Sequence, residues 1–147
     1  MIRTAFLLIT LALAGLAIGQ GVPCSTFVHG TFEEGTHTRQ EVLSGKPEGI
    51  RIVRRGGHHT EVDRATRVKV RYAVAWPDEC SFKLHDRSVR RGKPVRVWAP
   101  TDTITVRITD TFLEGFAYRC TFSWTDSVAT GSMKMIVPQG MGIGFGL

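Results

Sequence analysis

Apolar and polar residues alternate with a period of two from Ile50 onward. The clearest run covers residues 68–76, where one face is apolar and the other basic: Val68, Val70, Tyr72, Val74 and Trp76 against Arg67, Lys69 and Arg71. Successive side chains of a strand point to opposite faces, whereas a helix would repeat its apolar positions every 3.6 residues. The pattern therefore predicts a strand-rich chain.

Turn residues divide this pattern into short strands. Gly56-Gly57 separates the runs at 50–55 and 58–63, and paired glycines supply the positive φ of a two-residue hairpin turn. Further strands are predicted at 25–32, 68–76, 80–85, 95–97, 104–108, 116–124 and 132–137, with a basic loop at 86–94. Eight or nine short strands predict an all-β, single antiparallel meander, closed as a lipocalin-like barrel or folded as a sandwich.

The N-terminus has the pattern of a secretory signal peptide. Arg3 is its only charge, residues 5–18 contain no charge or proline, and Ala17-Ile18-Gly19 precedes Gln20. This run is too short for a transmembrane helix, which needs about 20 apolar residues. The alternative is a buried N-terminal helix, although no polar face interrupts the run. We expect a signal peptide over residues 1–19, cleavage near Gly19 and export to the periplasm or the extracellular space.

The rest of the chain predicts one domain and a tail. Removing residues 1–19 leaves 128 residues, enough for a single β domain over 20–137. Val22-Pro23 stands where a lipid anchor on Cys24 would need small residues, which favours a protein without that anchor. Glycine alternates with apolar residues over 138–147, and its backbone entropy predicts a mobile tail there.

The charge is basic and is densest in the predicted loop. The chain has 19 Lys and Arg against 13 Asp and Glu, and loss of Arg3 leaves a net charge of about +5. Five basic residues fall within ten positions: Arg87, Arg90, Arg91, Lys93 and Arg96. This loop is a candidate site for an anionic polymer of the cell envelope, and the alternative is a solvated loop whose arginines reflect codon usage. No nucleic-acid-binding motif is recognisable, so no nucleic-acid partner is expected.

Catalytic and metal-binding patterns are weak. His58 and His59 are adjacent, so in a regular strand they point to opposite faces and cannot both bind one ion. The serines lie in no Gly-x-Ser-x-Gly context, and no glycine-rich phosphate loop precedes a helix. Cys120 lies among aromatic residues, where burial raises a thiol pKa and keeps the thiol inert. The sequence predicts a protein that is not an enzyme and has no catalytic residues, metal or cofactor.

Two spaced elements carry a resemblance. One is Cys24-x-x-Phe27-x-x-Gly30-x-Phe32, and the other is Trp76-x-Asp78-x-Cys80-x-Phe82-x-Leu84. Together they resemble a group of short exported bacterial proteins of uncharacterised function, over most of residues 24–137, with a departure at Cys120. The resemblance implies a compact β-fold, an exported location and a disulfide between Cys24 and Cys80. The competing pair is Cys80 with Cys120, which share inward parity.

The predicted function is a non-catalytic binding or structural module of the cell envelope, with an anionic polymer or another protein as its partner. One alternative is a lipocalin-like carrier of a small apolar ligand. Another is a small outer-membrane β-barrel, whose strands need about 9 to 11 residues, more than the runs at 50–55, 58–63 and 80–85 provide. A carrier requires a lined cavity, roughly several hundred Å3, whereas inward aromatic residues fit a filled core equally well.

Overall fold

The structure is a computed structural model that describes residues 21–34 and 49–137. The predicted signal peptide, its cleavage site and the predicted tail at 138–147 lie outside the described residues. A short 3-10 helix, η1, precedes eight strands: η1 (Cys24–Phe27), β1 (Gly30–Glu34), β2 (Ile50–Arg55), β3 (His58–Asp63), β4 (Lys69–Asp78), β5 (Ser81–Arg91), β6 (Ile104–Phe112), β7 (Gly115–Phe122) and β8 (Thr125–Ile136).

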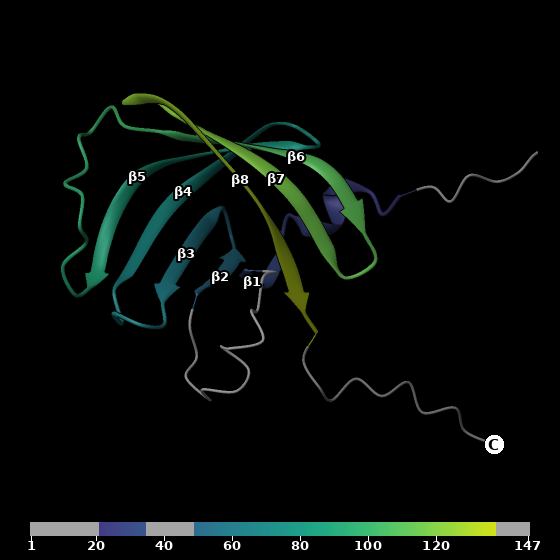
Figure 1. Cartoon of the computed structure of the whole chain (residues 1–147), viewed down its shortest axis with the longest axis horizontal. Coiled ribbons are helices and arrows are strands. Elements are labelled where there is room, and N and C mark those ends of the chain that lie inside the picture. Colours follow the sequence, from purple (N-terminus) through teal and green to yellow (C-terminus); the bar gives the residue numbers. More distant parts are fainter. Residues whose placement is uncertain (1–20, 35–48, 138–147) are drawn as a thin grey trace, which may run out of the picture.

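The strands pair antiparallel in chain order, and β8 pairs with β1 to close a barrel (Figure 1). The predicted all-β meander is thus confirmed, as a barrel rather than a sandwich. The hairpin at Gly56-Gly57 is also confirmed, since both glycines have positive φ (54° and 74°) and Arg55 pairs with His58. Only glycine adopts two such conformations in succession at little cost.

The predicted loop at 86–94 is wrong, because β5 continues to Arg91. Its pairing with β4 shifts register at three places, and Asp86 has a φ of 49°. A bulge inserts an extra residue and changes which face the following side chains occupy, so alternation is lost although the strand continues. The predicted strand at 95–97 is wrong as well, since Val95 and Val97 are exposed in the connection between β5 and β6.

Other strand boundaries also differ from the prediction. The segment predicted as a strand at 25–32 begins as η1, and the strand itself starts at Gly30. β8 begins at Thr125 instead of residue 132. The sequence pattern missed the first seven residues of this strand because all of them are exposed and show no apolar alternation. β4 extends to Asp78, whose side chain accepts a hydrogen bond from the amide of Cys80 in the following turn.

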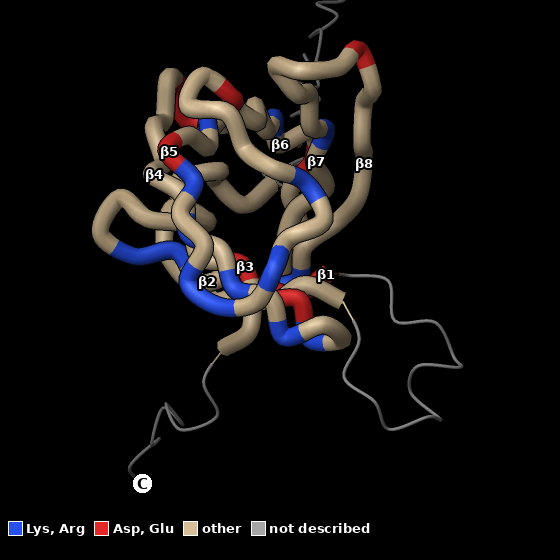
Figure 2. Tube along the Cα trace, turned by 90° about the vertical axis from the view of Figure 1, so that its left-hand side faces the viewer, with Lys and Arg blue, Asp and Glu red and all other residues tan. Residues whose placement is uncertain are grey.

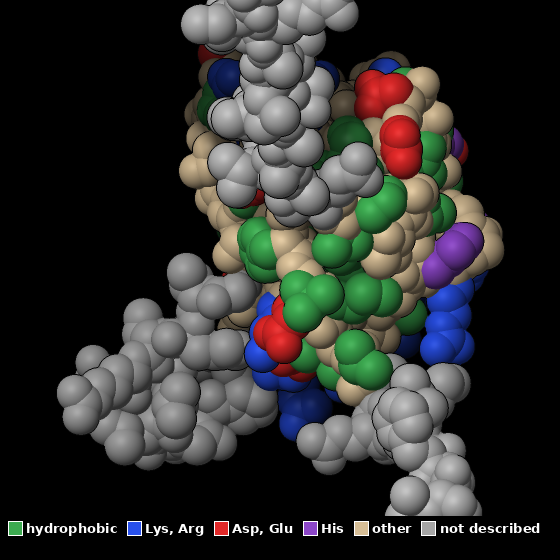
Figure 3. All heavy atoms as spheres, turned by 90° about the vertical axis from the view of Figure 1, so that its right-hand side faces the viewer, with side chains coloured by type: hydrophobic (Ala, Val, Ile, Leu, Met, Phe, Trp, Pro, Cys, Tyr) green, Lys and Arg blue, Asp and Glu red, His purple; other side chains and the backbone are tan. Residues whose placement is uncertain are grey.

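Because the strands alternate in direction, their connections gather at two ends of the barrel. We call the end with η1 and the turns at 56–57, 79–80 and 113–114 the closed end. The other end, the mouth, has the turns at 64–68 and 123–124 and the connection at 92–103. Figure 2 looks toward the mouth and Figure 3 toward the closed end, on which hydrophobic side chains gather.

Helix η1 closes its end of the barrel. The side chain of Phe27 is completely buried and packs against Phe32 and Phe116, with ring centroids 6.5 and 5.1 Å away. A disulfide between Cys24 and Cys80 ties η1 to the β4–β5 turn and confirms the pairing that the resemblance implied. The third cysteine, Cys120, is free. Among the described residues, no helix is long and apolar enough to cross a membrane.

Candidate functional site

A cavity of about 200 Å3 lies inside the barrel, beyond the aromatic cluster of the closed end. Most of its wall is apolar, and its lining includes Ile50, Ile52, Leu84, Ile104, Val106 and Phe122. The same wall carries polar groups from β1, β2, β3 and β7: Glu34, Arg54, His59, Glu61, Tyr118 and Cys120. An eight-stranded barrel is just wide enough to be filled by side chains or to hold one small ligand, and here the inner part is filled while the outer part is open.

Arg54 is the most unusual residue of this wall, because its side chain is 2 % exposed. Its Nη1 donates a 2.6 Å hydrogen bond to the carbonyl oxygen of Phe27, and its Nε donates a 3.3 Å bond to Nδ1 of His59. The guanidinium carbon also lies over four aromatic rings, at 4.3 to 5.8 Å from their centroids: Phe82, Phe32, Phe116 and Trp76. Arg54 thereby fastens η1 to the barrel interior through contacts that suit a cation.

Burial lowers the pKa of Arg54 to about 9, although the charge of Glu61 opposes this shift. The guanidinium therefore stays protonated at neutral pH. Desolvation disfavours the charged form of any buried cation, so the hydrogen bonds and aromatic rings around Arg54 offset part of a substantial cost. The closed end thus contains one buried positive charge.

His59 connects this cation to a carboxylate. His59 and Glu61 lie two residues apart on β3 and face inward together, while His58 points outward, as the alternation predicted. Nδ1 of His59 accepts the bond from Arg54, so the ring hydrogen is on Nε2, which donates to Oε1 of Glu61 at 2.9 Å. Burial lowers the pKa of His59 below its ordinary value despite the bond to Glu61, so this imidazole is neutral at pH 7.

Glu61 belongs to both the cavity and the mouth. It lines the cavity and also a second pocket of about 260 Å3, and Ile50 is likewise shared between them. Burial raises the pKa of Tyr118 to about 12 and that of Cys120 to about 11, and the charge of Glu61 contributes to both shifts. The Cys120 thiol is therefore protonated at neutral pH, as its aromatic neighbours predicted.

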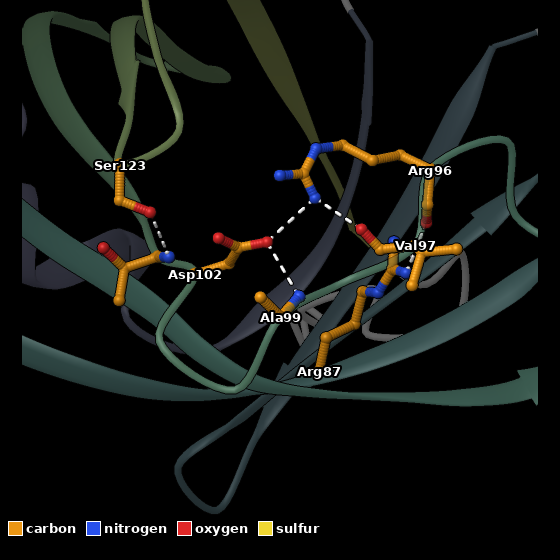
Figure 4. Close-up of polar contacts among 7 residues, drawn as sticks. Arg87, Arg96, Val97, Ala99, Asp102 and Ser123 are labelled. Carbon is orange, nitrogen blue, oxygen red and sulfur yellow. Dashed lines mark hydrogen bonds and ion pairs between the residues drawn. The ribbon is translucent and has the colours of Figure 1, made fainter.

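The connection between β5 and β6 is folded across the mouth by polar contacts (Figure 4). Asp102 holds the connection together, because its Oδ2 accepts from Nη1 of Arg96 at 2.8 Å and from the amide of Ala99 at 2.9 Å. The amide of Ala99, followed by Arg96, holds the pKa of Asp102 below its ordinary value. Arg87 on β5 donates to the carbonyl oxygen of Arg96 at 2.6 Å, which ties the connection to the barrel wall.

Aromatic side chains complete this cover. Trp98 of the connection packs edge-on against Tyr72 and Trp124, with ring centroids 5.4 and 5.3 Å away. Arg96 lies over the ring of Trp124 at 4.0 Å, and Arg87 lies over Trp98 at 5.1 Å. These contacts give the mouth a defined wall of aromatic and basic groups.

The five basic residues predicted as one anion-binding loop do not form one surface. Arg87, Arg90 and Arg91 belong to β5. Arg87 lines the mouth pocket with Lys93 and Arg96, whereas Arg90 lines a groove on the outside of the barrel. Arg91 ends β5 opposite Lys69. A strand places neighbouring side chains on different faces, so closeness in sequence does not bring these charges together.

Sequence reasoning missed Arg54 and Glu34 and gave Glu61 no role in a cavity. The alternation of side chains could have identified Arg54. It lies two residues after Ile52 on the same strand, so it faces inward with Ile50 and Ile52 and places a charge among apolar side chains. No group of three or more His, Cys, Asp or Glu side chains within 21–34 and 49–137 is placed to hold a metal ion.

The cavity is thus a small apolar space with one buried cation, one neutral imidazole and two carboxylates in its wall. Its Arg54–His59–Glu61 chain is hydrogen-bonded along its length. In sequence and fold comparisons the chain matches no protein family, no curated protein and no solved structure.

Proposed function

We propose that the protein is a non-catalytic binding protein that holds one small, mainly apolar molecule in the barrel cavity. The observation that carries this proposal is the cavity of about 200 Å3 with its largely apolar wall. An engineered apolar cavity of about 150 Å3 binds benzene, so this volume suits a ligand of one ring and a short side chain. Pockets with an apolar wall and a few placed polar groups are typical of small-molecule sites.

The polar groups favour a ligand that donates hydrogen bonds. Arg54 donates hydrogen bonds to Phe27 and His59 and is enclosed by aromatic rings, so its guanidinium is already engaged by protein groups. The carboxylates of Glu34 and Glu61 also line the cavity. Carboxylate oxygens accept hydrogen bonds and attract positive charge. An amine therefore fits this wall better than an acid of the same shape.

The reactive groups favour binding over turnover. Burial keeps the Cys120 thiol protonated, with a pKa of about 11, and a protonated thiol is a poor nucleophile. His59 has both ring nitrogens engaged, by Arg54 and by Glu61, so neither is free for a substrate proton. These side chains contribute polarity and rigidity to the site.

Export to the cell envelope is part of the same proposal. Its support is the predicted signal peptide together with the Cys24–Cys80 disulfide, since disulfides persist in oxidising compartments and are rare in a reducing cytosol. Secretion of the full chain with loss of about 19 N-terminal residues, measured by mass spectrometry of the exported protein, tests this part.

Three ligands of matched shape test the cavity: phenethylamine, 2-phenylethanol and phenylacetate, titrated by calorimetry. We expect saturable binding in the order amine, alcohol, acid. Ala129→Phe places a ring in the cavity lining and should abolish binding. Val128→Phe is the matched control, because it adds the same ring one residue earlier on β8, at a position that does not line the cavity. The proposal fails if none of the three ligands binds, or if Ala129→Phe binds them as tightly as Val128→Phe does.

A further inference from the structure

The outer face of β2, β3, β4 and β5 is strongly basic. On β2, β4 and β5 the inward positions are largely apolar and the outward positions carry Arg and Lys, while β3 contributes His58 and Thr60 to the outer face. The outward side chains form a groove of about 420 Å3, which we call the basic groove, lined by Val53, Arg55, His58, Thr60, Lys69, Arg71 and Arg90. In Figure 2, Lys and Arg positions gather on the side of the barrel where β2, β4 and β5 are labelled. We propose that the basic groove binds a linear anionic polysaccharide.

The charges of the groove are not compensated within the described residues. Arg55, Lys69, Arg71 and Arg90 make no ion pair with any carboxylate in 21–34 or 49–137. Three basic side chains elsewhere on the barrel are paired, Arg64 with Glu33, Arg96 with Asp102 and Lys134 with Glu114, whereas others, such as Arg107 and Arg119, are not paired in the described part of the chain. Asp86 lines an adjoining pocket together with His58, Arg71 and Arg90, and its carboxylate is hydrogen-bonded to His85 at 2.8 Å. Among the residues that the structure describes, four basic side chains without an ion pair therefore line one groove, and such a cluster attracts an anionic partner.

The arrangement of these charges suits an extended chain. Arg55 pairs with His58 across β2 and β3, Thr60 pairs with Arg71 across β3 and β4, and Arg90 follows on β5. Neighbouring strands lie about 4.8 Å apart, so the basic positions span roughly 14 Å across the strands. A linear polymer lying across the strands meets several of them at once, whereas a single small anion meets one or two.

The other side chains of the groove favour a polysaccharide over a membrane or a nucleic acid. None of the large exposed hydrophobic residues of the barrel belongs to the groove, so it offers nothing to insert among lipid tails. Its described lining also contains no Phe, Tyr or Trp side chain, so the exposed imidazole of His58 is the only ring there on which a base could stack. Thr60 in its lining suits hydroxyl groups, and Arg forms paired hydrogen bonds with carboxylate or sulfate.

Two triple variants with the same change in net charge test the proposal. The groove variant is Arg55→Ser, Arg71→Ser and Arg90→Ser, and the control is Arg67→Ser, Arg107→Ser and Arg119→Ser, three exposed arginines that do not line the groove. Affinity for dextran sulfate and for polygalacturonate is measured by calorimetry at several salt concentrations, after circular dichroism confirms that both variants fold. We expect the groove variant to lose at least about tenfold in affinity and about two units of the log–log salt slope, while the control loses much less.

Three outcomes would overturn the proposal. Equal losses in both variants would mean that net charge alone drives binding. Unchanged binding in the groove variant would remove the groove as a site. Tighter, groove-dependent binding to single-stranded oligonucleotides or to anionic vesicles would assign the groove to another class of partner. Ala129→Phe, which changes the cavity wall, should bind dextran sulfate as the unmodified protein does, so the result is independent of the cavity ligand.

Discussion

The disulfide between Cys24 and Cys80 closes a loop between residues 56 positions apart. In the chain-entropy model, a cross-link over a loop of this length restricts the unfolded chain enough to stabilise the fold by about 4 kcal/mol. The bond also holds η1 across the closed end, where Phe27 fills the barrel and its carbonyl oxygen accepts from Arg54. The double variant Cys24→Ser and Cys80→Ser should therefore lose about 4 kcal/mol of its free energy of unfolding.

Urea unfolding, followed by tryptophan fluorescence, measures this loss. With a dependence of about 1.5 kcal/mol per M urea, as expected for a domain of this size, the midpoint should fall by roughly 2.7 M. Cys120→Ser is the control, since Cys120 takes no part in the disulfide. Treating the unmodified protein with a reductant should reproduce the double variant without any substitution.

A midpoint shift below about 0.7 M, equivalent to roughly 1 kcal/mol, would refute this reasoning. It would mean that the unfolded chain is already compact between residues 24 and 80, or that the packing of η1 alone determines stability. An equal shift in Cys120→Ser would show that the loss comes from the polar hydroxyl and not from the missing cross-link.

Three further predictions follow from the interior and the mouth. The pKa of His59 in the folded protein lies below 6.5, so between these two pKa values the unfolded chain binds a proton that the folded chain does not. The free energy of unfolding should therefore be highest above pH 6.5 and fall by up to about 1.4 kcal/mol per pH unit below it. In thermal unfolding at several pH values, His59→Gln should lose this dependence of stability on pH. His58→Gln, which changes an exposed imidazole of the same strand, is the control. An unchanged pH dependence in His59→Gln contradicts the role given to His59. Alkylation of Cys120 by iodoacetamide should accelerate about tenfold per pH unit from pH 8 toward 11, because only the thiolate reacts and its pKa is about 11; a rate that levels off by pH 9 disproves burial of the thiol. Asp102→Asn weakens the ion pair with Arg96, so hydrogen exchange of the Ala99 amide should become faster; protection equal to that of the unmodified protein argues against Asp102 as the anchor of the mouth.

The local sequence was sufficient to predict those elements whose structure depends only on neighbouring residues. The run from Val68 to Trp76 alternates because one face of β4 is buried, and Gly56-Gly57 specifies a turn because glycine adopts positive φ freely. The inert character of Cys120 also followed from its neighbours, because aromatic residues at its own parity bury it.

The alternation of apolar and polar residues gave wrong strand boundaries where a strand is exposed or contains a bulge. The first half of β8 has no buried face, so it shows no alternation, yet the hydrogen bonds of β7 hold it as a strand. In β5 the register shifts against β4 move Arg87 into the mouth and Arg90 onto the outer face. Pairing with a neighbouring strand fixes these placements, and periodicity within one segment does not report it.

The sequence by itself determined the class of fold, because alternation and turn residues act over a few positions. Only the tertiary structure decided that the sheet closes as a barrel, that Arg54, His59 and Glu61 line up inside it, and that a cavity remains beside them. These features depend on which strands meet across the barrel and on how completely their side chains fill it. Both are set by contacts between residues far apart in the chain, which a local pattern of apolar and polar positions does not encode.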